Sequence, residues 1–181
     1  MKQIAFRLSV AVVLFTASCQ KPSRPVKDAS ADSTTVQFYR EDELVDAATK
    51  IVGFLRAEAP FHPDVFSDTV TLYIAPEGGG ATRKVARELL RDPANWRVGN
   101  YTLTPPLKST KLLTRVGRHL NCRDFPLSTR YPQLARLPHV GTMLEPPGGG
   151  SCLQTWNLTL VFGTEASTPK LVAAVYDQWE W

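Results

Sequence analysis

Near the C-terminal end of the chain, apolar and polar residues alternate in two runs, and this pattern constrains the fold more than any other. One face of the first run carries Trp156, Leu158, Leu160 and Phe162, and the other face carries Thr155, Asn157 and Thr159. One face of the second run carries Leu171, Ala173, Val175, Trp179 and Trp181. A turn at residues 163–169 separates them. Alternation with a period of two is typical of strands, so the two runs predict an antiparallel hairpin.

The segments that precede this hairpin favour helices and one further strand. Residues 41–59 predict a long amphipathic helix, with Leu44, Ala48, Ile51 and Leu55 at helical spacing behind three acidic residues that suit a helix N-terminus. Alternation over residues 69–75 predicts a strand. Residues 82–91 predict a shorter second helix, whose apolar residues are Val85, Leu89 and Leu90.

The middle of the chain has a weaker pattern. Short strands are predicted at residues 101–104 and 111–116. Five prolines and the run Gly148-Gly149-Gly150 mark residues 126–150 as a long irregular connection. A connection of this length inside a small domain needs a restraint.

Helices followed by a terminal antiparallel sheet predict an α+β domain, with the helices packed on one face of a curved sheet. This order of elements resembles the cystatin-like folds, particularly the nuclear-transport-factor-2-like or SnoaL-like superfamily. Residues 157–162 and 170–177 look like the last hairpin of that group. The resemblance implies a pocket on the concave face of the sheet, in which acidic side chains can be catalytic.

The first residues have the pattern of an export signal. Lys2 and Arg7 are basic, residues 8–17 are apolar except for Ser9 and Thr16, and small residues follow. The apolar run is shorter than the roughly 20 residues that a membrane span needs. We therefore expect a secretory signal and not a transmembrane helix.

Ala17-Ser18-Cys19 resembles the lipobox of bacterial lipoproteins, although Thr16 stands where that family usually has leucine. The resemblance implies cleavage before Cys19 and attachment to the membrane by acyl chains on this residue. Gln20 implies the outer rather than the inner membrane, by the sorting habit of the family. The expected organisation is a signal peptide at residues 1–18, a lipidated cysteine and flexible tether at 19–35, and one domain at 36–181 in the periplasm.

Cys122 and Cys152 are the two remaining cysteines. A pair in an exported protein predicts a disulfide, and this one would span most of the irregular connection. Two buried free thiols are an alternative. A metal site that includes His119 is a second alternative, but it needs more soft ligands than the chain offers. We expect no metal and no cofactor.

Basic residues are concentrated in one part of the domain. Residues 82–136 contain twelve Lys or Arg against three acidic residues, which predicts a basic face. Gly78-Gly79-Gly80 leads into the predicted second helix, where Arg83, Lys84 and Arg87 are candidate anion-binding residues. A flexible loop is the alternative interpretation. Export makes lipid phosphate, an anionic glycan or an acidic protein the expected partner, and excludes nucleic acid.

Candidate catalytic residues are few. The chain has no nucleophile, zinc-protease or phosphate-loop motif, and we interpret His62, His119 and His139 as turn or capping residues. Asp177 shares the apolar face of Val175, where a carboxylate must be hydrogen-bonded, paired or protonated, unless the strand twists it into solvent. We expect a non-catalytic, lipid-anchored envelope domain that binds a protein or an anionic component. The alternative is a SnoaL-like small-molecule enzyme or ligand-binding protein with a pocket containing Asp177.

Overall fold

The computed structural model describes residues 39–74, 80–105, 112–120, 126–144 and 155–177. Every described residue belongs to one compact unit, Ala31–Trp181. Cys19, Cys122 and Cys152 lie outside the described residues, as do Trp179 and Trp181. The lipid anchor and the disulfide therefore stay predictions.

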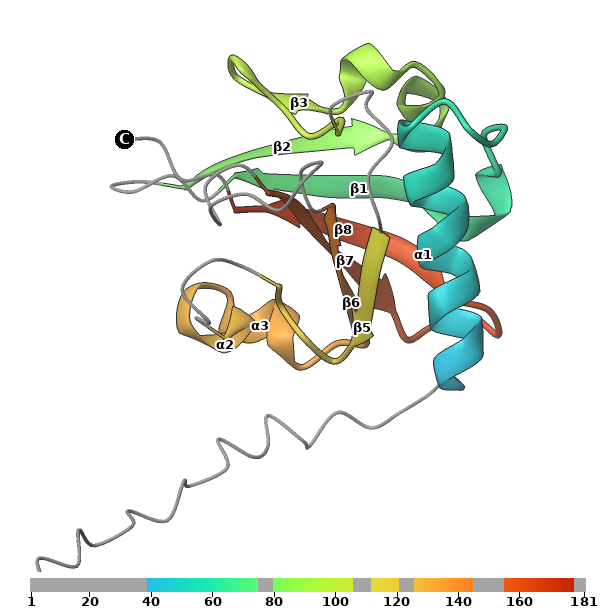
Figure 1. Ribbon diagram of the computed structural model, residues 1–181, viewed down its shortest axis with the longest axis vertical. Helices are drawn as coiled ribbons and strands as arrows, with labels where there is room; N and C mark the ends of the chain where they lie inside the picture. Colours follow the sequence, from blue (N-terminus) through green and yellow to red (C-terminus); the bar gives the residue numbers. More distant parts are fainter. Residues whose placement is uncertain (1–38, 75–79, 106–111, 121–125, 145–154, 178–181) are drawn as a thin grey trace, which may run out of the picture. The chain divides into compact units, whose positions relative to one another are not determined.

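A six-stranded mixed sheet forms the centre of the second unit (Figure 1). Its order is β2-β1-β8-β7-β6-β5. The strands are β1 (Phe66–Ile74), β2 (Ala81–Ala86), β5 (Leu112–Val116), β6 (His139–Leu144), β7 (Trp156–Gly163) and β8 (Lys170–Tyr176). All neighbours pair antiparallel except β1 and β8, which run parallel. A small second sheet pairs β3 (Arg97–Val98) with β4 (Tyr101–Thr102).

Helix α1 (Glu41–Leu55) packs its apolar stripe on one face of the large sheet. The Glu43 carboxylate accepts the Arg40 backbone N–H at 2.9 Å and so satisfies a donor at the start of the helix. Ala57, with φ of 57°, ends it in the left-handed region, before the predicted end at residue 59. Leu158, Leu160 and Phe162 of β7 lie in the same core and are fully buried.

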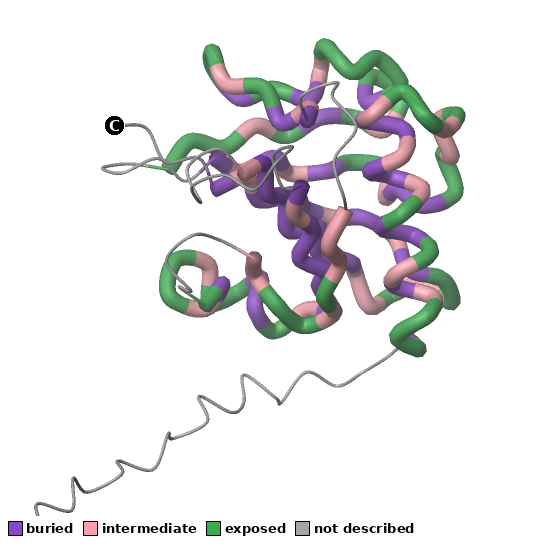
Figure 2. Tube along the Cα trace, viewed as in Figure 1, coloured by how far each residue is buried: buried purple, intermediate pink, exposed green. Residues whose placement is uncertain are grey.

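The opposite face of the sheet is covered by two short helices, α2 (Leu127–Arg130) and α3 (Pro132–Ala135). Leu127 and Leu134 pack there with Val161 and Val175, whose side chains point away from the α1 side. Strands β6, β7 and β8 are accordingly buried along most of their length (Figure 2). The α+β class is confirmed, but the expectation that the helices lie on one face is wrong.

Residues 82–91 do not form the predicted second helix. They form most of β2 and then a 3₁₀ segment, η2 (Arg87–Arg91). The apolar residues fit a helical spacing, but β1 supplies an antiparallel partner, with Val70 opposite Val85. Pairing with a distant strand thus overrides the local pattern.

Two further differences concern the other strands. Residues 126–150 were expected to be irregular, yet they contain α2, α3 and β6, a strand inside the sheet. In β8, a bulge at Val172 interrupts the register, because Val161 pairs with Ala173 whereas Phe162 pairs with Leu171. Leu171 therefore faces the α1 core, and Ala173 faces the opposite side.

Candidate functional site

Asp177 follows β8 directly and is buried, with 3% of its surface exposed. The side chain of Asn157 in β7 makes two hydrogen bonds with the Asp177 backbone. The Asn157 side-chain amide donates to the Asp177 carbonyl oxygen at 3.1 Å, and the Asp177 N–H donates to the Asn157 side-chain oxygen at 3.3 Å. The carboxylate is thus fixed on the sheet side that α2 and α3 cover, and the alternative in which it reaches solvent is wrong.

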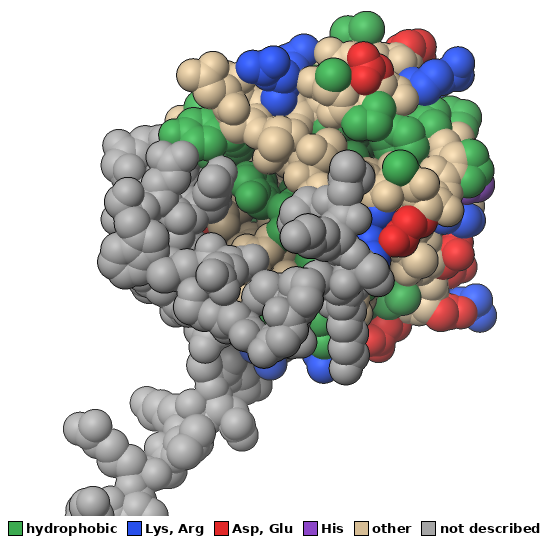
Figure 3. Space-filling view, turned by 45° about the horizontal axis from the view of Figure 1, so that its top comes forward, with side chains coloured by type: hydrophobic (Ala, Val, Ile, Leu, Met, Phe, Trp, Pro, Cys, Tyr) green, Lys and Arg blue, Asp and Glu red, His purple; other side chains and the backbone are tan. Residues whose placement is uncertain are grey.

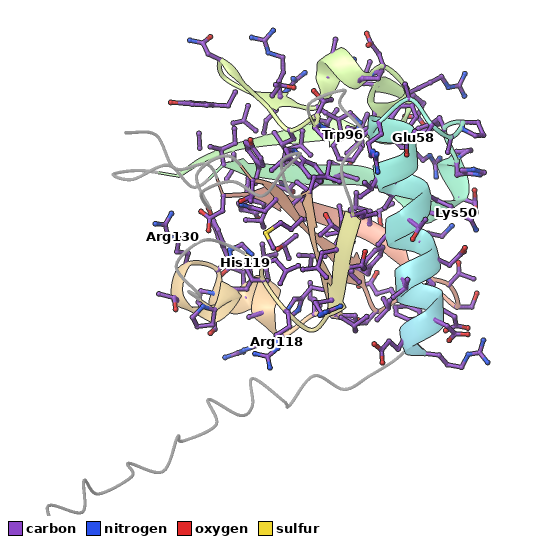
Figure 4. The ribbon with its side chains drawn as sticks, in the orientation of Figure 1. Lys50, Glu58, Trp96, Arg118, His119 and Arg130 are labelled. Carbon is purple, nitrogen blue, oxygen red and sulfur yellow. The ribbon has the colours of Figure 1, made fainter. Side chains whose placement is uncertain are left out.

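His119 joins Asp177 to Thr159 of β7. Its Nε2 lies 3.0 Å from Asp177 Oδ2, and its Nδ1 lies 2.6 Å from Thr159 Oγ1. Both ring nitrogens of His119 are thus engaged, and its tautomer sets which atom donates in the contact with Thr159. The His119 side chain is 5% exposed and lies between α3 and the strands, whereas the neighbouring Arg118 points outward (Figure 4).

Gly141 allows the segment that carries His119 to approach the sheet. It stands opposite Thr159 in the β6–β7 register. A Cβ on Gly141 would clash with the Arg118 carbonyl oxygen and would lie 2.9 Å from Leu120 Cγ. The backbone on both sides of His119 therefore crosses directly over Gly141, and this crossing brings the imidazole to Thr159.

Helices α2 and α3 supply a cation and a phenol to the same place. Arg130 NH1 lies 3.7 Å from Asp177 Oδ1, and the Arg130 side chain is 32% exposed. Burial raises the pKa of the adjacent Tyr131 phenol, the Asp177 charge raises this pKa further, and Arg130 lowers it. Tyr131 also packs edge-on against Tyr73 of β1, with 5.0 Å between ring centroids. We call these residues, Asp177, His119, Thr159, Arg130 and Tyr131, the Asp177 site.

One polar atom of the Asp177 site lacks a hydrogen bond to any described residue. Asp177 Oδ1 is buried and has no hydrogen-bond partner among the described residues, since Arg130 approaches it only as an ion pair. A buried carboxylate oxygen without a donor costs free energy. The polar atoms that link Thr159, His119 and Asp177 are hydrogen-bonded to one another, and Thr159 is only 1% exposed. Oδ1 is therefore an enclosed polar atom of this site that lacks a hydrogen-bond donor among the described residues.

The candidate anion-binding residues do not converge. Arg83 donates to the backbone carbonyls of Asn95 and Arg97 at 3.3 and 3.2 Å. Lys84, the next residue of β2, points to the opposite face and is exposed. Arg87 pairs with Asp68 and Glu88. The predicted helix N-terminus is also missing here, because these residues belong to β2 and η2.

The described cations of the wider basic segment do not form one face either. It begins at β2 and continues through β5, and these strands are the two opposite edges of the sheet. Lys and Arg side chains accordingly appear as separate groups (Figure 3). Within the described part of the chain, several of these cations still have no acidic partner, namely Lys84, Arg91, Arg118 and Arg136.

Sequence reasoning selected Asp177 but missed its partners. His119 was interpreted as a turn or capping residue, and Arg130 was counted only as a surface cation. Nothing in the sequence links residues 119, 130, 159 and 177, because their proximity depends on strand pairing. His139 is a satisfied core residue, since its Nδ1 lies 2.9 Å from the Leu137 carbonyl oxygen.

Comparison with known proteins adds no assignment. No family model matches the chain, and neither the curated proteins nor the solved structures contain a match to it. In the described ranges, no group of three or more His, Cys, Asp or Glu residues is arranged to hold a metal ion. Nor does any described helix have the length and apolar character of a membrane span.

Proposed function

We propose that this chain is a lipid-anchored protein of the bacterial cell envelope, whose domain binds a small polar ligand at the Asp177 site. The observation that carries the proposal is Asp177 Oδ1, a buried carboxylate oxygen that receives no hydrogen bond from the described residues. A site that lacks one donor is completed by a ligand that brings it. We propose binding rather than catalysis, because Thr159 and His119 are enclosed and satisfied by each other.

The kinship with cystatin-like, SnoaL-like domains is part of this proposal. It is supported by a long first helix and by the antiparallel pairing of β7 with β8. The parallel pairing of β1 with β8 departs from the antiparallel sheet that we expected. A polar site on the sheet face opposite α1 is compatible with either arrangement.

The envelope location rests on the apolar run that ends in Ala17-Ser18-Cys19. The Cys19→Ala variant should lose its acyl anchor and leave the membrane fraction, or accumulate as an unprocessed precursor. Fractionation of cells that express either chain measures this directly. An outer-membrane location, expected from Gln20, is tested by separating the two membranes on a density gradient.

The ligand proposal is tested by replacing the carboxylate. A thermal-shift screen of small polar compounds should yield ligands whose stabilisation of the chain is lost in Asp177→Asn. The matched control is Asp68→Asn, because Asp68 is a strand carboxylate with a 92% exposed side chain. Ligands that stabilise both variants equally would bind elsewhere and would refute the proposal.

A second candidate function is binding to an anionic lipid headgroup, and the cations without an acidic partner among the described residues favour it. The Lys84→Glu, Arg91→Glu double variant tests the β2 edge, and Arg118→Glu with Arg136→Glu tests the β5 edge. Vesicles of phosphatidylglycerol should retain one of these variants less than the other, and less as salt rises. Equal retention of both variants at all salt concentrations contradicts the candidate.

A further inference from the structure

We propose that the end of the sheet at which the chain enters the domain faces the membrane, and that Arg118 and Arg136 bind the phosphate groups of anionic phospholipids there. This inference rests on the proposed lipid anchor and chooses between the two groups of cations. Three observations carry it: the point at which the chain enters the domain, the strands that begin or end at that point, and the division of charge there.

Tyr39 fixes the point at which the chain enters the domain. It is 5% exposed, and its hydroxyl donates to the carbonyl oxygens of Gly163 and Ala166, each at 2.8 Å. Gly163 ends β7 and pairs with Lys170, the first residue of β8. The domain is therefore joined to the residues that precede Tyr39 beside the turn between β7 and β8.

Arg118 and Arg136 lie at this same end of the sheet. Strand β6 begins here, because His139 pairs with Val161 near the end of β7. The Gly117 N–H donates to the His139 carbonyl oxygen at 2.8 Å, so Arg118 follows β5 at this end. Arg136 follows α3 and stands three residues before His139. Both arginines are exposed, and Figure 4 shows that the Arg118 side chain points outward.

The charges at this end are divided between the two faces of the sheet. Helix α1 covers one face and begins at this end with three acidic residues in its first turn. The Arg118 backbone crosses Gly141 on the other face, where α3 also packs. Arg118 and Arg136 have no acidic partner among the described residues. An anionic surface therefore attracts the α3 side of this end and repels the α1 side.

The proposed anchor makes a weak contact sufficient. Cys19 stands only 20 residues before Tyr39, so acyl chains on Cys19 keep Tyr39 within about 70 Å of the bilayer. This confinement gives an effective concentration on the order of a millimolar. Each arginine that reaches anionic lipid favours the docked state by about fivefold, and two favour it by about thirtyfold. A guanidinium suits this contact because its planar fork can bind one phosphate group through two hydrogen bonds.

The test uses the full lipidated chain in vesicles and measures how fast each arginine reacts with phenylglyoxal. Mass spectrometry of the digested chain reports the arginines separately. In vesicles that contain phosphatidylglycerol, Arg118 and Arg136 should react about fivefold more slowly than in vesicles of phosphatidylcholine alone. Arg91, an exposed arginine that follows the edge strand β2, is the internal control and should react equally in both. The protection should decrease as salt rises, because exposed charges are screened.

Two variants separate a specific contact from general attraction. Arg136→Gln removes one of the two contacts and should reduce the protection of Arg118 about fivefold. The matched control, Arg91→Gln, removes the same charge from the molecule and should leave the protection of Arg118 unchanged. Both variants replace exposed side chains, so both should fold. Equal loss of protection in the two variants would mean that only net charge matters, and it would overturn the inference.

The remaining outcomes separate this inference from the proposed function. If the chain stays with the vesicles but Arg91 is protected instead of Arg118, the membrane-facing end is wrong and the anchor stands. If both lipids protect Arg118 equally, the partner is not an anionic headgroup. If no arginine is protected in a chain that the vesicles retain, the domain does not dock. If the Cys19→Ala chain is retained as the wild type is, the proposed anchor fails, and this inference fails with it.

Discussion

At the scale of single residues, the hydrogen bond between Thr159 and His119 is the contact that most directly fixes the site. Its two atoms are 2.6 Å apart and both side chains are buried. Thr159 is therefore more than a polar residue on the back of β7. It gives one imidazole nitrogen a hydrogen-bond partner, and the other nitrogen is directed at Asp177.

Replacing Thr159 by valine should destabilise the domain by about 1–3 kcal/mol, because it leaves a buried imidazole nitrogen without its hydrogen-bond partner while preserving side-chain shape. Urea denaturation measures the free energy of unfolding. The control is Thr69→Val, since Thr69 is an exposed threonine of β1 and valine suits a strand. Equal stability of Thr159→Val and the wild type would mean that the hydrogen bond contributes nothing.

Gly141 affects the hydrogen bond between Thr159 and His119, because it lets the backbone of residues 118–120 lie close to β6. Gly141→Ala should push the Arg118–Leu120 backbone away from β6, at a cost of about 1–3 kcal/mol, because the added Cβ meets the backbone of Arg118 and Leu120 as well as the Leu120 side chain. The His119 ring protons should shift in the NMR spectrum as the imidazole leaves Thr159.

Gly99→Ala is the control for this prediction. Gly99 has φ of 57° with no atom near the added Cβ, so alanine there brings only the backbone penalty of about 1–2 kcal/mol. Its His119 resonances should match those of the wild type. Unchanged His119 resonances in Gly141→Ala would contradict the role assigned to this glycine.

At the scale of elements, α2 and α3 belong to a hydrophobic cluster separate from the main core. Leu134→Ala should loosen these helices locally, because Leu134 anchors α3 and is 7% exposed. Hydrogen exchange should accelerate at the Tyr131 and Ala135 amides much more than in α1. Ile51→Ala, in the main core, should instead accelerate exchange throughout the domain. If Leu134→Ala behaves like Ile51→Ala, the two clusters unfold together.

The elements differ in how far the sequence alone predicts them. Helix α1 and strand β1 each have one buried face, so their periodicity is visible. Strand β7 is buried on both faces, but its second face carries Asn157 and Thr159, so apolar and polar residues still alternate. Strand β6 is buried on both faces, which removes the alternation, and its glycine and preceding proline resemble a loop. The bulge at Val172 reverses the face of Leu171 relative to Ala173, and no local signal announces it.

The candidate site, like the elements, could be predicted from the sequence only in part. Asp177 could be found because a charged residue interrupted an apolar face within one strand. His119, Thr159 and Arg130 come from a loop, another strand and a short helix, and only the sheet register brings them together. The cations could be counted from the sequence, but their division between two edges depended on the strand order.

At the scale of the whole molecule, the tyrosines predict how stability changes with pH. Burial is the main cause that raises the pKa of Tyr131, Tyr176 and Tyr39 above 10.0. The folded state therefore retains these protons more tightly than the unfolded state. The stability this provides is fully present below pH 10.0 and is lost as pH rises through the folded-state pKa values.

The melting temperature should accordingly fall above pH 10.0. Ultraviolet absorbance should show that these tyrosines ionise at a higher pH than tyrosine in an unfolded chain. Tyr131→Phe should make the decline with pH shallower, because one of the shifted groups is gone. A control, Phe61→Tyr, adds a phenol at a partly buried position outside the Asp177 site. Stability that stays flat well above pH 10.0 would rule out this linkage.

The parallel pairing of β1 with β8 has a consequence for when the chain can fold. Phe66 lies opposite Leu171, so the middle of the sheet joins strands separated by most of the domain's length. Contacts between residues so far apart in the sequence form slowly. The chain must lose the entropy of closing a long loop before the hydrogen bonds between the two strands compensate for that loss. A chain still emerging from the ribosome has β1 and β2 but no β8 to place between β1 and β7. We therefore expect the sheet to close only after β8 has been synthesised, which is compatible with the export that we propose from the N-terminal residues.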